Sequence, residues 1–127
     1  RVLPADKRGE LMARFSSKLM APGDEIITEG QVGRGLYIIL DGLVQVTARK
    51  AGKNHSLNFL REGDIFGEIS LLKNSPATAT CTAMRRTMVM FLAREAFAEF
   101  TRDYPKVVQK ISEMGEFRLL DNIYTLA

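Results

Sequence analysis

Glycine recurs at short intervals through the middle of the chain, and this spacing restricts the fold more than any other feature. The segments between the glycines are strand-sized and rich in β-branched and aromatic residues. The glycines are Gly23, Gly30, Gly33, Gly35, Gly42, Gly52, Gly63 and Gly67. The strand-like segments are residues 25–28, 36–40, 43–47, 56–60, 79–83 and 88–92. Many short strands separated by turn residues predict a mainly β fold, a sandwich or a roll of about eight strands.

Local patterns within these segments add two expectations. Asp41-Gly42 stands between two apolar runs, which predicts a hairpin with a type I′ turn. Residues 78–83 alternate threonine with small apolar residues, so one face of that strand is polar and the other is apolar. Cys81 falls on the apolar face and is therefore predicted to lie in the core.

Both ends of the chain have helical patterns instead. Residues 4–15 carry Leu11, Met12 and Phe15 at helical spacing. After residue 93, Tyr104-Pro105 divides a short helix from a longer one, because proline is well accommodated in the first turn of a helix. The predicted architecture is one domain, 1–127, in which an eight-stranded β-roll (jelly roll) at 16–93 is flanked by an N-terminal helix at 4–15 and C-terminal lid helices at 94–122.

The composition argues against catalysis. Cys81 is the only cysteine, and His55, expected in a polar loop at 50–55, is the only histidine. One histidine cannot supply the several ligands of a cupin-type metal site. A Ser-His-Asp or Cys-His arrangement is not expected either, because the sole cysteine is predicted to point into the core and the histidine is remote in sequence. We therefore expect no enzyme activity, no catalytic residue, no metal and no cofactor.

Charge and hydropathy limit the partners. The net charge is +3, but basic residues stand beside acidic ones, as in Arg94-Glu95 and Arg102-Asp103, so no nucleic-acid surface is expected. No run approaches the ~20 apolar residues of a membrane-spanning helix, and no signal-peptide pattern is present. We expect a cytoplasmic piece of a longer polypeptide, which could be the cytosolic domain of a membrane protein, with no membrane insertion of its own.

Residues 66–79 suit a small anionic ligand that carries a sugar. Gly67 allows a sharp turn and a close backbone approach, and residues 68–72 can form a short helix whose free N–H groups face a phosphate. The Glu68 carboxylate can accept hydrogen bonds from two sugar hydroxyls, and Thr78 adds a hydroxyl. Taken alone, Glu68 is better interpreted as a solvated or helix-capping acid.

The whole of residues 3–122 resembles the cyclic-nucleotide-binding domain family. The resemblance is carried by Phe66, Gly67, Glu68, Ile69, Ser70, Leu71, Leu72, Thr78 and Ala79, which match the family's phosphate-binding cassette, and by residues 22–30 and 36–42 upstream. It implies a helix-flanked β-roll that binds cAMP or cGMP, with the C-terminal helix closing over the base. Under this resemblance the nucleotide is the partner, and Phe66, Gly67, Glu68, Ile69, Ser70, Ala77, Thr78 and Ala79 form its site.

The chain departs from the family pattern at one position. Ala77 stands where the family carries an arginine that pairs with the cyclic phosphate. A charge-assisted hydrogen bond contributes roughly 1.5–3 kcal/mol, so its loss predicts weaker binding by one to two or more powers of ten. Lys73 could swing toward the phosphate, although a solvent-facing loop lysine is the better expectation.

The likeness extends further to the domains of nucleotide-modulated ion channels. It implies a base pocket and lid formed by Val46, Asn58, Leu60, Arg118 and Asn122. The function expected is thus a regulatory module that senses cAMP or cGMP and signals through its C-terminal helix to an effector in the same polypeptide, with a channel or transporter favoured over a transcription factor. The alternative is a degenerate roll that has lost nucleotide binding and acts as a structural or interaction module.

Overall fold

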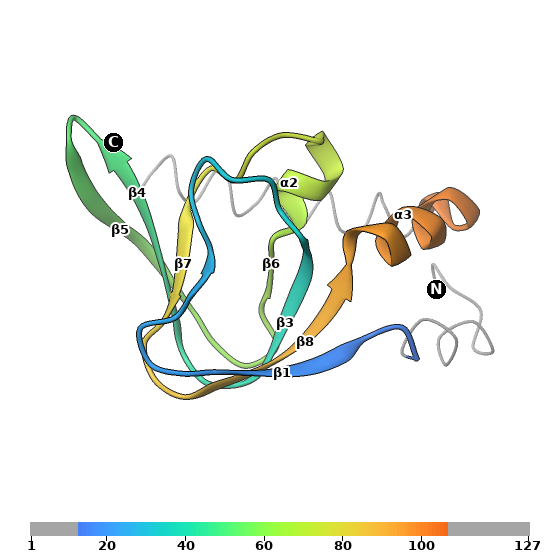
Figure 1. Cartoon of the computed structure of the whole chain (residues 1–127), viewed down its shortest axis with the longest axis horizontal. Coiled ribbons are helices and arrows are strands. Elements are labelled where there is room, and N and C mark those ends of the chain that lie inside the picture. Colours follow the sequence, from blue (N-terminus) through green and yellow to red (C-terminus); the bar gives the residue numbers. More distant parts are fainter. Residues whose placement is uncertain (1–12, 107–127) are drawn as a thin grey trace.

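Two four-stranded antiparallel sheets form the domain (Figure 1). The computed structural model describes residues 13–106, without the side chains of Ile69 and Leu72. The strands are β1 (Ser16–Met20), β2 (Glu25–Ile27), β3 (Gly35–Asp41), β4 (Val44–Lys50), β5 (Lys53–Leu60), β6 (Ile65–Phe66), β7 (Thr80–Ala83) and β8 (Thr87–Ala93), and the helices are α2 (Glu68–Lys73) and α3 (Arg94–Asp103). The sheet orders are β1-β8-β3-β6 and β2-β7-β4-β5. The expected mainly β, eight-stranded roll is confirmed.

The main core lies between the two sheets, where each strand turns its apolar residues inward. Ile39 and Val89 from one sheet and Val44 from the other are 1% exposed or less. Tyr37 stacks on Phe66 with 5.0 Å between ring centroids. Cys81 is buried in the same cluster, as its strand pattern predicted, while Thr80 and Thr82 beside it are half-buried.

A second, smaller core attaches the helices to β3 and β8. Leu71 of α2 and Phe97 of α3 pack with Leu36 and Leu92, which are neighbours across the β3–β8 pair. Figure 1 shows both helices beside the ends of these strands, well away from the tip of the β4–β5 hairpin. The helices are thus fixed by apolar contact to one end of the roll.

The predicted hairpin at Asp41-Gly42 is wrong. The strands on either side, β3 and β4, belong to different sheets, so this connection crosses between sheets. The type I′ geometry occurs instead at Ala51-Gly52, where both φ angles are positive (54° and 76°), and this turn joins the paired strands β4 and β5. The apolar runs on either side of Asp41-Gly42 both face the shared core. Two such runs have the same sequence pattern whether or not they pair with each other, so the pattern did not predict their pairing.

The same hairpin corrects the placement of His55. The residue lies in β5, not in a polar loop, because β5 already begins at Lys53. The first four residues of β5 are all exposed, so the alternation that signals a half-buried strand is missing there. Strands β1 and β6 also lie outside the strand-like segments, the first being mostly exposed and the second only two residues long.

The helical predictions are confirmed in part. Residues 13–14 form a turn, so the N-terminal helix does not extend to residue 15 as expected, and residues 4–12 lie outside the described part. Helix α3 matches the short helix expected after residue 93, and Pro105 begins helical structure again after Tyr104. The rest of the segment in which the longer helix is expected lies outside the described residues, and the single-domain assignment remains a prediction. Within residues 13–106, no helix has the length and apolar character needed to cross a membrane.

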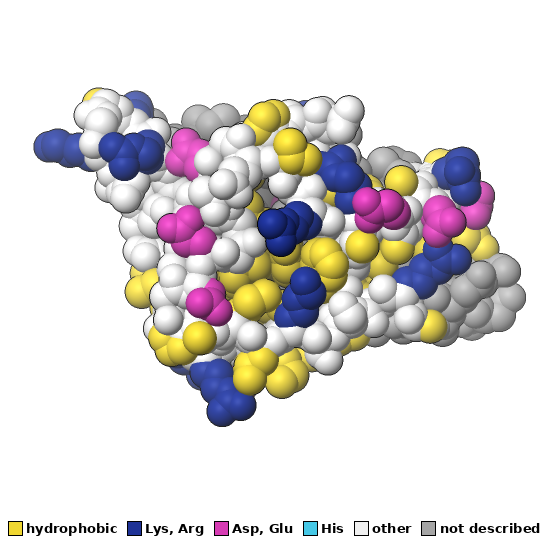
Figure 2. All heavy atoms as spheres, in the orientation of Figure 1, with side chains coloured by type: hydrophobic (Ala, Val, Ile, Leu, Met, Phe, Trp, Pro, Cys, Tyr) yellow, Lys and Arg dark blue, Asp and Glu magenta, His cyan; other side chains and the backbone are white. Residues whose placement is uncertain are grey.

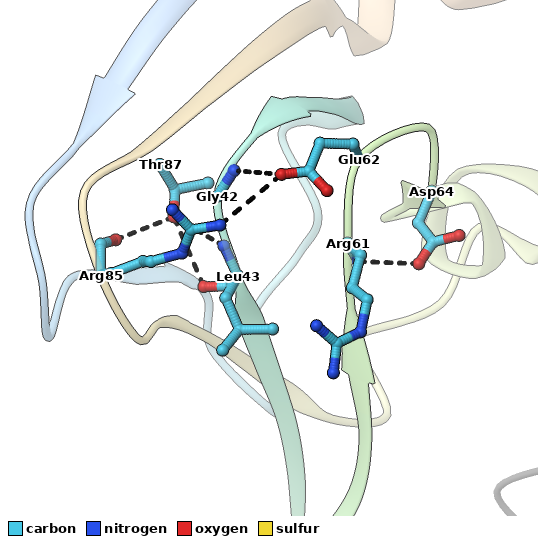
Figure 3. Close-up of polar contacts among 7 residues, drawn as sticks. All are labelled: Gly42, Leu43, Arg61, Glu62, Asp64, Arg85 and Thr87. Atoms are coloured by element: carbon cyan, nitrogen blue, oxygen red, sulfur yellow. Dashed lines mark hydrogen bonds and ion pairs between the residues drawn. The ribbon is translucent and has the colours of Figure 1, made fainter.

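The crossing between sheets is closely packed around Gly42 (Figure 3). The Thr87 side chain is fully buried, and its Oγ1 donates to the Arg85 carbonyl oxygen at 2.8 Å. The Gly42 N–H donates to Oε1 of Glu62 at 3.2 Å, and the same oxygen lies 3.6 Å from Nη2 of Arg85. A Cβ atom added at Gly42 would lie 2.3 Å from Oγ1 of Thr87, so only glycine fits this position.

We predict that Gly42→Ala destabilises the fold more than Gly52→Ala does. Both positions have positive φ, but a Cβ at Gly52 meets nothing within 4 Å, so only the Gly42 variant adds a steric overlap. The overlap should cost about 1–3 kcal/mol beyond the backbone strain that both variants share. Urea unfolding of the two variants measures the difference, and equal losses would contradict this account of the crossing.

A second prediction concerns acid stability. Hydrogen bonds from its own backbone N–H and then from the Gly42 N–H lower the pKa of Glu62. A lowered pKa in the folded state stabilises the fold above the unfolded carboxyl's pKa, and this contribution disappears as the pH falls through the folded value. Glu62→Gln should therefore reduce the loss of stability between about pH 5 and about pH 3, as followed by thermal unfolding. An unchanged pH dependence would show that the carboxylate does not contribute.

Candidate functional site

Helix α2 begins directly after β6, and Gly67 makes the junction possible. Gly67 is the N-cap of α2 with φ 90°, and a Cβ there would lie 2.7 Å from the Gly35 carbonyl oxygen. Glycine alone combines this backbone conformation with so close an approach to β3. The expected short helix is present and runs from Glu68 to Lys73. Its first turn therefore sits at the edge of the roll, over the interior.

A cavity lies between α2 and the second sheet. The space that a water-sized molecule can occupy in it is about 50 Å³, which is less than the usual volume of small-ligand sites, ~300–1,000 Å³. It is lined by Ile27, Gly33, Val46, Leu60, Phe66, Gly67, Glu68, Ser70, Ala77, Thr78, Ala79 and Cys81. The residues predicted within 66–79 line this cavity, apart from Ile69, whose side chain lies outside the described part. Val46 of β4 and Leu60 of β5 line it as well.

The Glu68 side chain is the most unusual part of the lining. It is only 1% exposed, although it carries an ionisable carboxyl group. Burying a carboxylate costs free energy unless hydrogen-bond donors compensate for the lost water. Most of the neighbouring lining is apolar, with Val46, Leu60 and Phe66 among the most buried residues of the chain. A carboxylate in such a cavity is suited to accept hydrogen bonds from ligand hydroxyls.

Ser70 holds α2 against the loop that precedes β3. Its Oγ accepts a hydrogen bond from the Gly33 N–H at 3.2 Å and donates to the Ser75 carbonyl oxygen at 2.5 Å. A Cβ at Gly33 would lie 2.8 Å from this hydroxyl, so the contact requires glycine. Ser70 lines the cavity, but its hydroxyl is engaged in holding the helix in place.

Arg94, the first residue of α3, holds the same loop from the other side. Its Nε donates to the Gly33 carbonyl oxygen at 3.0 Å, and its Nη1 lies 3.4 Å from Oδ1 of Asn74, the C-cap of α2. Sequence reasoning missed this role, because no local pattern links residues 33, 74 and 94. The contact joins α3 to the wall of the cavity.

Ala77 and Thr78 form the far side of the cavity. The Ala77 N–H donates to the Gln31 carbonyl oxygen at 2.9 Å, and its carbonyl oxygen accepts from the Gly30 N–H at 2.8 Å, so its backbone is held on both sides. Thr78 is exposed at the mouth. Among the described lining residues, Glu68 is the only one with a charged side chain.

The basic side chains of this region face a second hollow. This hollow shares Ile27 and Gly33 with the first cavity and is also lined by Lys18, Arg34 and Tyr37. Figure 2 shows Lys and Arg side chains over hydrophobic ones in the middle of this face. Burial raises the pKa of the Tyr37 hydroxyl, and the charge of Arg34 opposes that rise, which is consistent with Arg34 facing Tyr37.

One expected site residue, Asn58, is not part of the described lining, and three others have side chains outside the described part of the chain. Asn58 is half-buried, is not part of the lining, and its Oδ1 accepts a hydrogen bond from the Phe59 N–H. Ile69 lies within α2, but its side chain is outside the described part, as are Arg118 and Asn122 altogether. Ile27 lines the cavity although sequence reasoning did not select it, because it looks like any apolar strand residue. Across the described residues, no group of three or more His, Cys, Asp or Glu could hold a metal.

Comparison with protein families gives a match for most of the chain. Residues 18–104 match the family model described as "Cyclic nucleotide-binding domain". The cAMP-dependent protein kinase regulatory subunit of Yarrowia lipolytica is 35% identical over 91 residues, which are 72% of this chain and 24% of that protein. The cyclic nucleotide-gated channel beta-1 of Bos taurus is 34% identical over 116 residues, 89% of this chain and 8% of that protein.

Solved structures share the fold. The Thermus thermophilus catabolite activator protein superimposes with a TM-score of 0.82 at 26% identity, over 98% of this chain and 59% of that one. The regulatory subunit of a cAMP-independent protein kinase A from Trypanosoma cruzi, bound to guanosine, gives 0.80 at 26% identity, over 98% and 45%. This chain therefore spans well under two-thirds of the length of these proteins.

We predict that Ser70→Ala destabilises the fold because it leaves the buried Gly33 N–H without its acceptor. The expected loss is about 1–3 kcal/mol. Ser56→Ala is the matched control, since the Ser56 hydroxyl only accepts an exposed contact from Gln45. Urea unfolding compares the two variants, and a loss no greater than that of the control would contradict a structural role for the Ser70 hydroxyl.

Proposed function

The chain belongs to the cyclic nucleotide-binding domain family, and from this we propose that it is a regulatory module that senses a cyclic nucleotide in the α2 cavity. We propose cAMP or cGMP as the ligand and an effector in the same polypeptide as the responder. The two relatives compared above are a regulatory subunit of a kinase and a channel, and this chain matches only part of the length of each.

The buried Glu68 carboxylate carries the proposal. It lines the α2 cavity and is almost completely shielded from solvent. The free 2′-hydroxyl of a 3′,5′-cyclic nucleotide can donate a hydrogen bond to this carboxylate. The purine would then lie against the apolar lining from Val46, Leu60 and Cys81. A neutral ring needs no charged partner there.

The signal would pass from α2 to α3. Leu71 and Phe97 pack in one cluster, and Arg94 links the C-cap of α2 to the Gly33 loop. A ligand that stabilises one position of α2 therefore also stabilises one position of α3. Binding would in this way shift the equilibrium between two conformations of the domain without a covalent step. We propose a channel or transporter as the effector, in the cytoplasm. A kinase or a transcription regulator is an equal candidate.

A second candidate function rests on Ala77. Loss of the phosphate-binding cation would be expected in a roll that no longer binds nucleotide and serves as a structural or interaction module. The buried Glu68 argues against this, since a degenerate cavity would gain from a smaller or apolar residue there.

The test is calorimetric titration of the 127-residue chain with cAMP and with cGMP. We expect measurable, weak binding, and a loss of about tenfold to a hundredfold with Glu68→Gln, because a charged hydrogen-bond acceptor is removed. Glu95→Gln is the matched control, since Glu95 is an exposed acid on the neighbouring helix. Absence of binding in both the wild type and Ala77→Arg would overturn the sensor function and support the structural module.

A further inference from the structure

We propose that the second hollow, between β1 and β2, is a separate ligand site that takes a small zwitterion of the amino-acid type, with a carboxylate, an ammonium group and an apolar side chain. It borders the α2 cavity, since Ile27 and Gly33 line both. The inference goes beyond the proposed function because it concerns a different ligand, and it does not depend on whether a cyclic nucleotide binds.

The size and position of this hollow are the first observation. The space that a water-sized molecule can occupy in it is about 320 Å³, which lies within the usual range of small-ligand sites, ~300–1,000 Å³. Its lining comes from β1, β2, β3 and the loop between β2 and β3. Strands β1 and β2 are the edge strands of the two sheets. The hollow is therefore an opening between the sheets at one edge of the roll.

One wall of the hollow carries positive charge. Lys18 lies on the core-facing side of β1, because its pair partner Val89 is fully buried, and its Nζ lies 4.1 Å from the centre of the Phe91 ring. Arg34 stands directly before β3, and Tyr37 of β3 lines the same wall. Burial raises the pKa of the Tyr37 hydroxyl, so this group stays protonated and can donate a hydrogen bond. The wall thus offers several donors to a carboxylate.

The wall from the second sheet carries negative charge. Asp24 and Glu25 line it where β2 begins. Oδ2 of Asp24 accepts a hydrogen bond from the Ala21 N–H at 2.8 Å, and Oε1 of Glu25 accepts one from Oγ1 of Thr28 at 3.0 Å. These contacts orient the two carboxylates, and each carboxylate has lone pairs left for a further donor. An ammonium group is such a donor.

The two walls do not neutralise each other. In the part of the chain that the structure describes, neither Lys18 nor Arg34 forms an ion pair with Asp24 or Glu25. Figure 2 shows acidic side chains beside the central hydrophobic patch and basic ones over it. A ligand that carries both charges can contact both walls at once. A simple anion would be attracted by one wall and repelled by the other, so it would gain less.

The lining between the charged walls is apolar. It includes Met20, Ile26, Ile27 and Val32. The first three are half-buried and pack against the main core, while Val32 is 69% exposed. An apolar side chain of the ligand would cover part of this exposed surface, which favours binding. The three features together therefore point to an amino acid with an apolar side chain.

Charged residues on edge strands have a second known use, because they discourage pairing with another chain. Lys18 on β1 would serve this purpose without any ligand. Protection of an edge does not require an opening of ligand size between the strands, nor oppositely charged walls around it. The experiment below distinguishes the two roles.

Calorimetric titration of the 127-residue chain with L-leucine tests the inference. We expect saturable binding that weakens about fivefold or more with N-acetyl-L-leucine, which lacks the ammonium group, and with L-leucinamide, which lacks the carboxylate. Glycine should also bind more weakly, because it has no side chain to cover the apolar lining. A higher salt concentration should weaken the binding of L-leucine, since its contacts are ionic and lie near solvent.

Two variants assign the walls. Arg34→Gln should weaken L-leucine binding about fivefold and reduce the preference for L-leucine over L-leucinamide. Glu25→Gln should instead reduce the preference for L-leucine over N-acetyl-L-leucine. Arg86→Gln is the matched control, because Arg86 is exposed and does not line the hollow. Thermal unfolding without ligand checks that each variant folds.

The outcomes separate this inference from the proposed function. If L-leucine shows no saturable binding to the wild type, the inference is overturned and the charges retain only the role of protecting the sheet edges. Equal binding of L-leucine and its two derivatives also overturns it, as does an Arg34→Gln variant that binds like Arg86→Gln. Glu68→Gln should bind L-leucine as the wild type does, so a chain that fails to bind cyclic nucleotide can still confirm this site.

Discussion

One residue, Gly33, joins the three segments on which the site depends. Its N–H is held by the Ser70 hydroxyl of α2, and its carbonyl oxygen is held by the Arg94 guanidinium of α3. The loop itself continues into β3, at the centre of the first sheet. Because these contacts meet at one residue without a side chain, the positions of α2, α3 and the roll are coupled. Glu68 keeps its place in the cavity only while this junction holds α2 against the loop.

The electrostatics of the cavity follow from that placement. A buried acid is normally balanced by a neighbouring cation or by hydrogen-bond donors. Among the described lining residues Glu68 alone has a charged side chain, and Arg94 is engaged at the Gly33 junction. A sugar hydroxyl is a suitable donor to such a carboxylate. The chain thus combines a buried acid at the start of α2 with an alanine at position 77 in the lining of the same cavity.

The sequence predicted the parts of the site that are contiguous along the chain. Gly67 and Glu68 are adjacent, and the turn and the short helix that they begin depend on local backbone conformation. This turn and helix could therefore be predicted from the sequence. The strand count followed from glycine spacing for the same reason. The role of Arg94 and the placement of β3 and β4 in different sheets could not be predicted, because each depends on which distant segments meet. An Asp-Gly pair and an Ala-Gly pair both permit a tight turn, and only the sheet assembly made the second one the hairpin.

The two ends of the β4–β5 hairpin differ in how well they tolerate change. At its base, Val46 and Leu60 form part of the cavity lining, and changes there alter the shape that a ligand meets. At its tip, the turn at Ala51-Gly52 and the first residues of β5 are exposed and project from the roll (Figure 1). Exposed loop tips tolerate insertion well. The tip therefore offers an attachment point for a dye or a fused reporter that leaves the ligand site untouched.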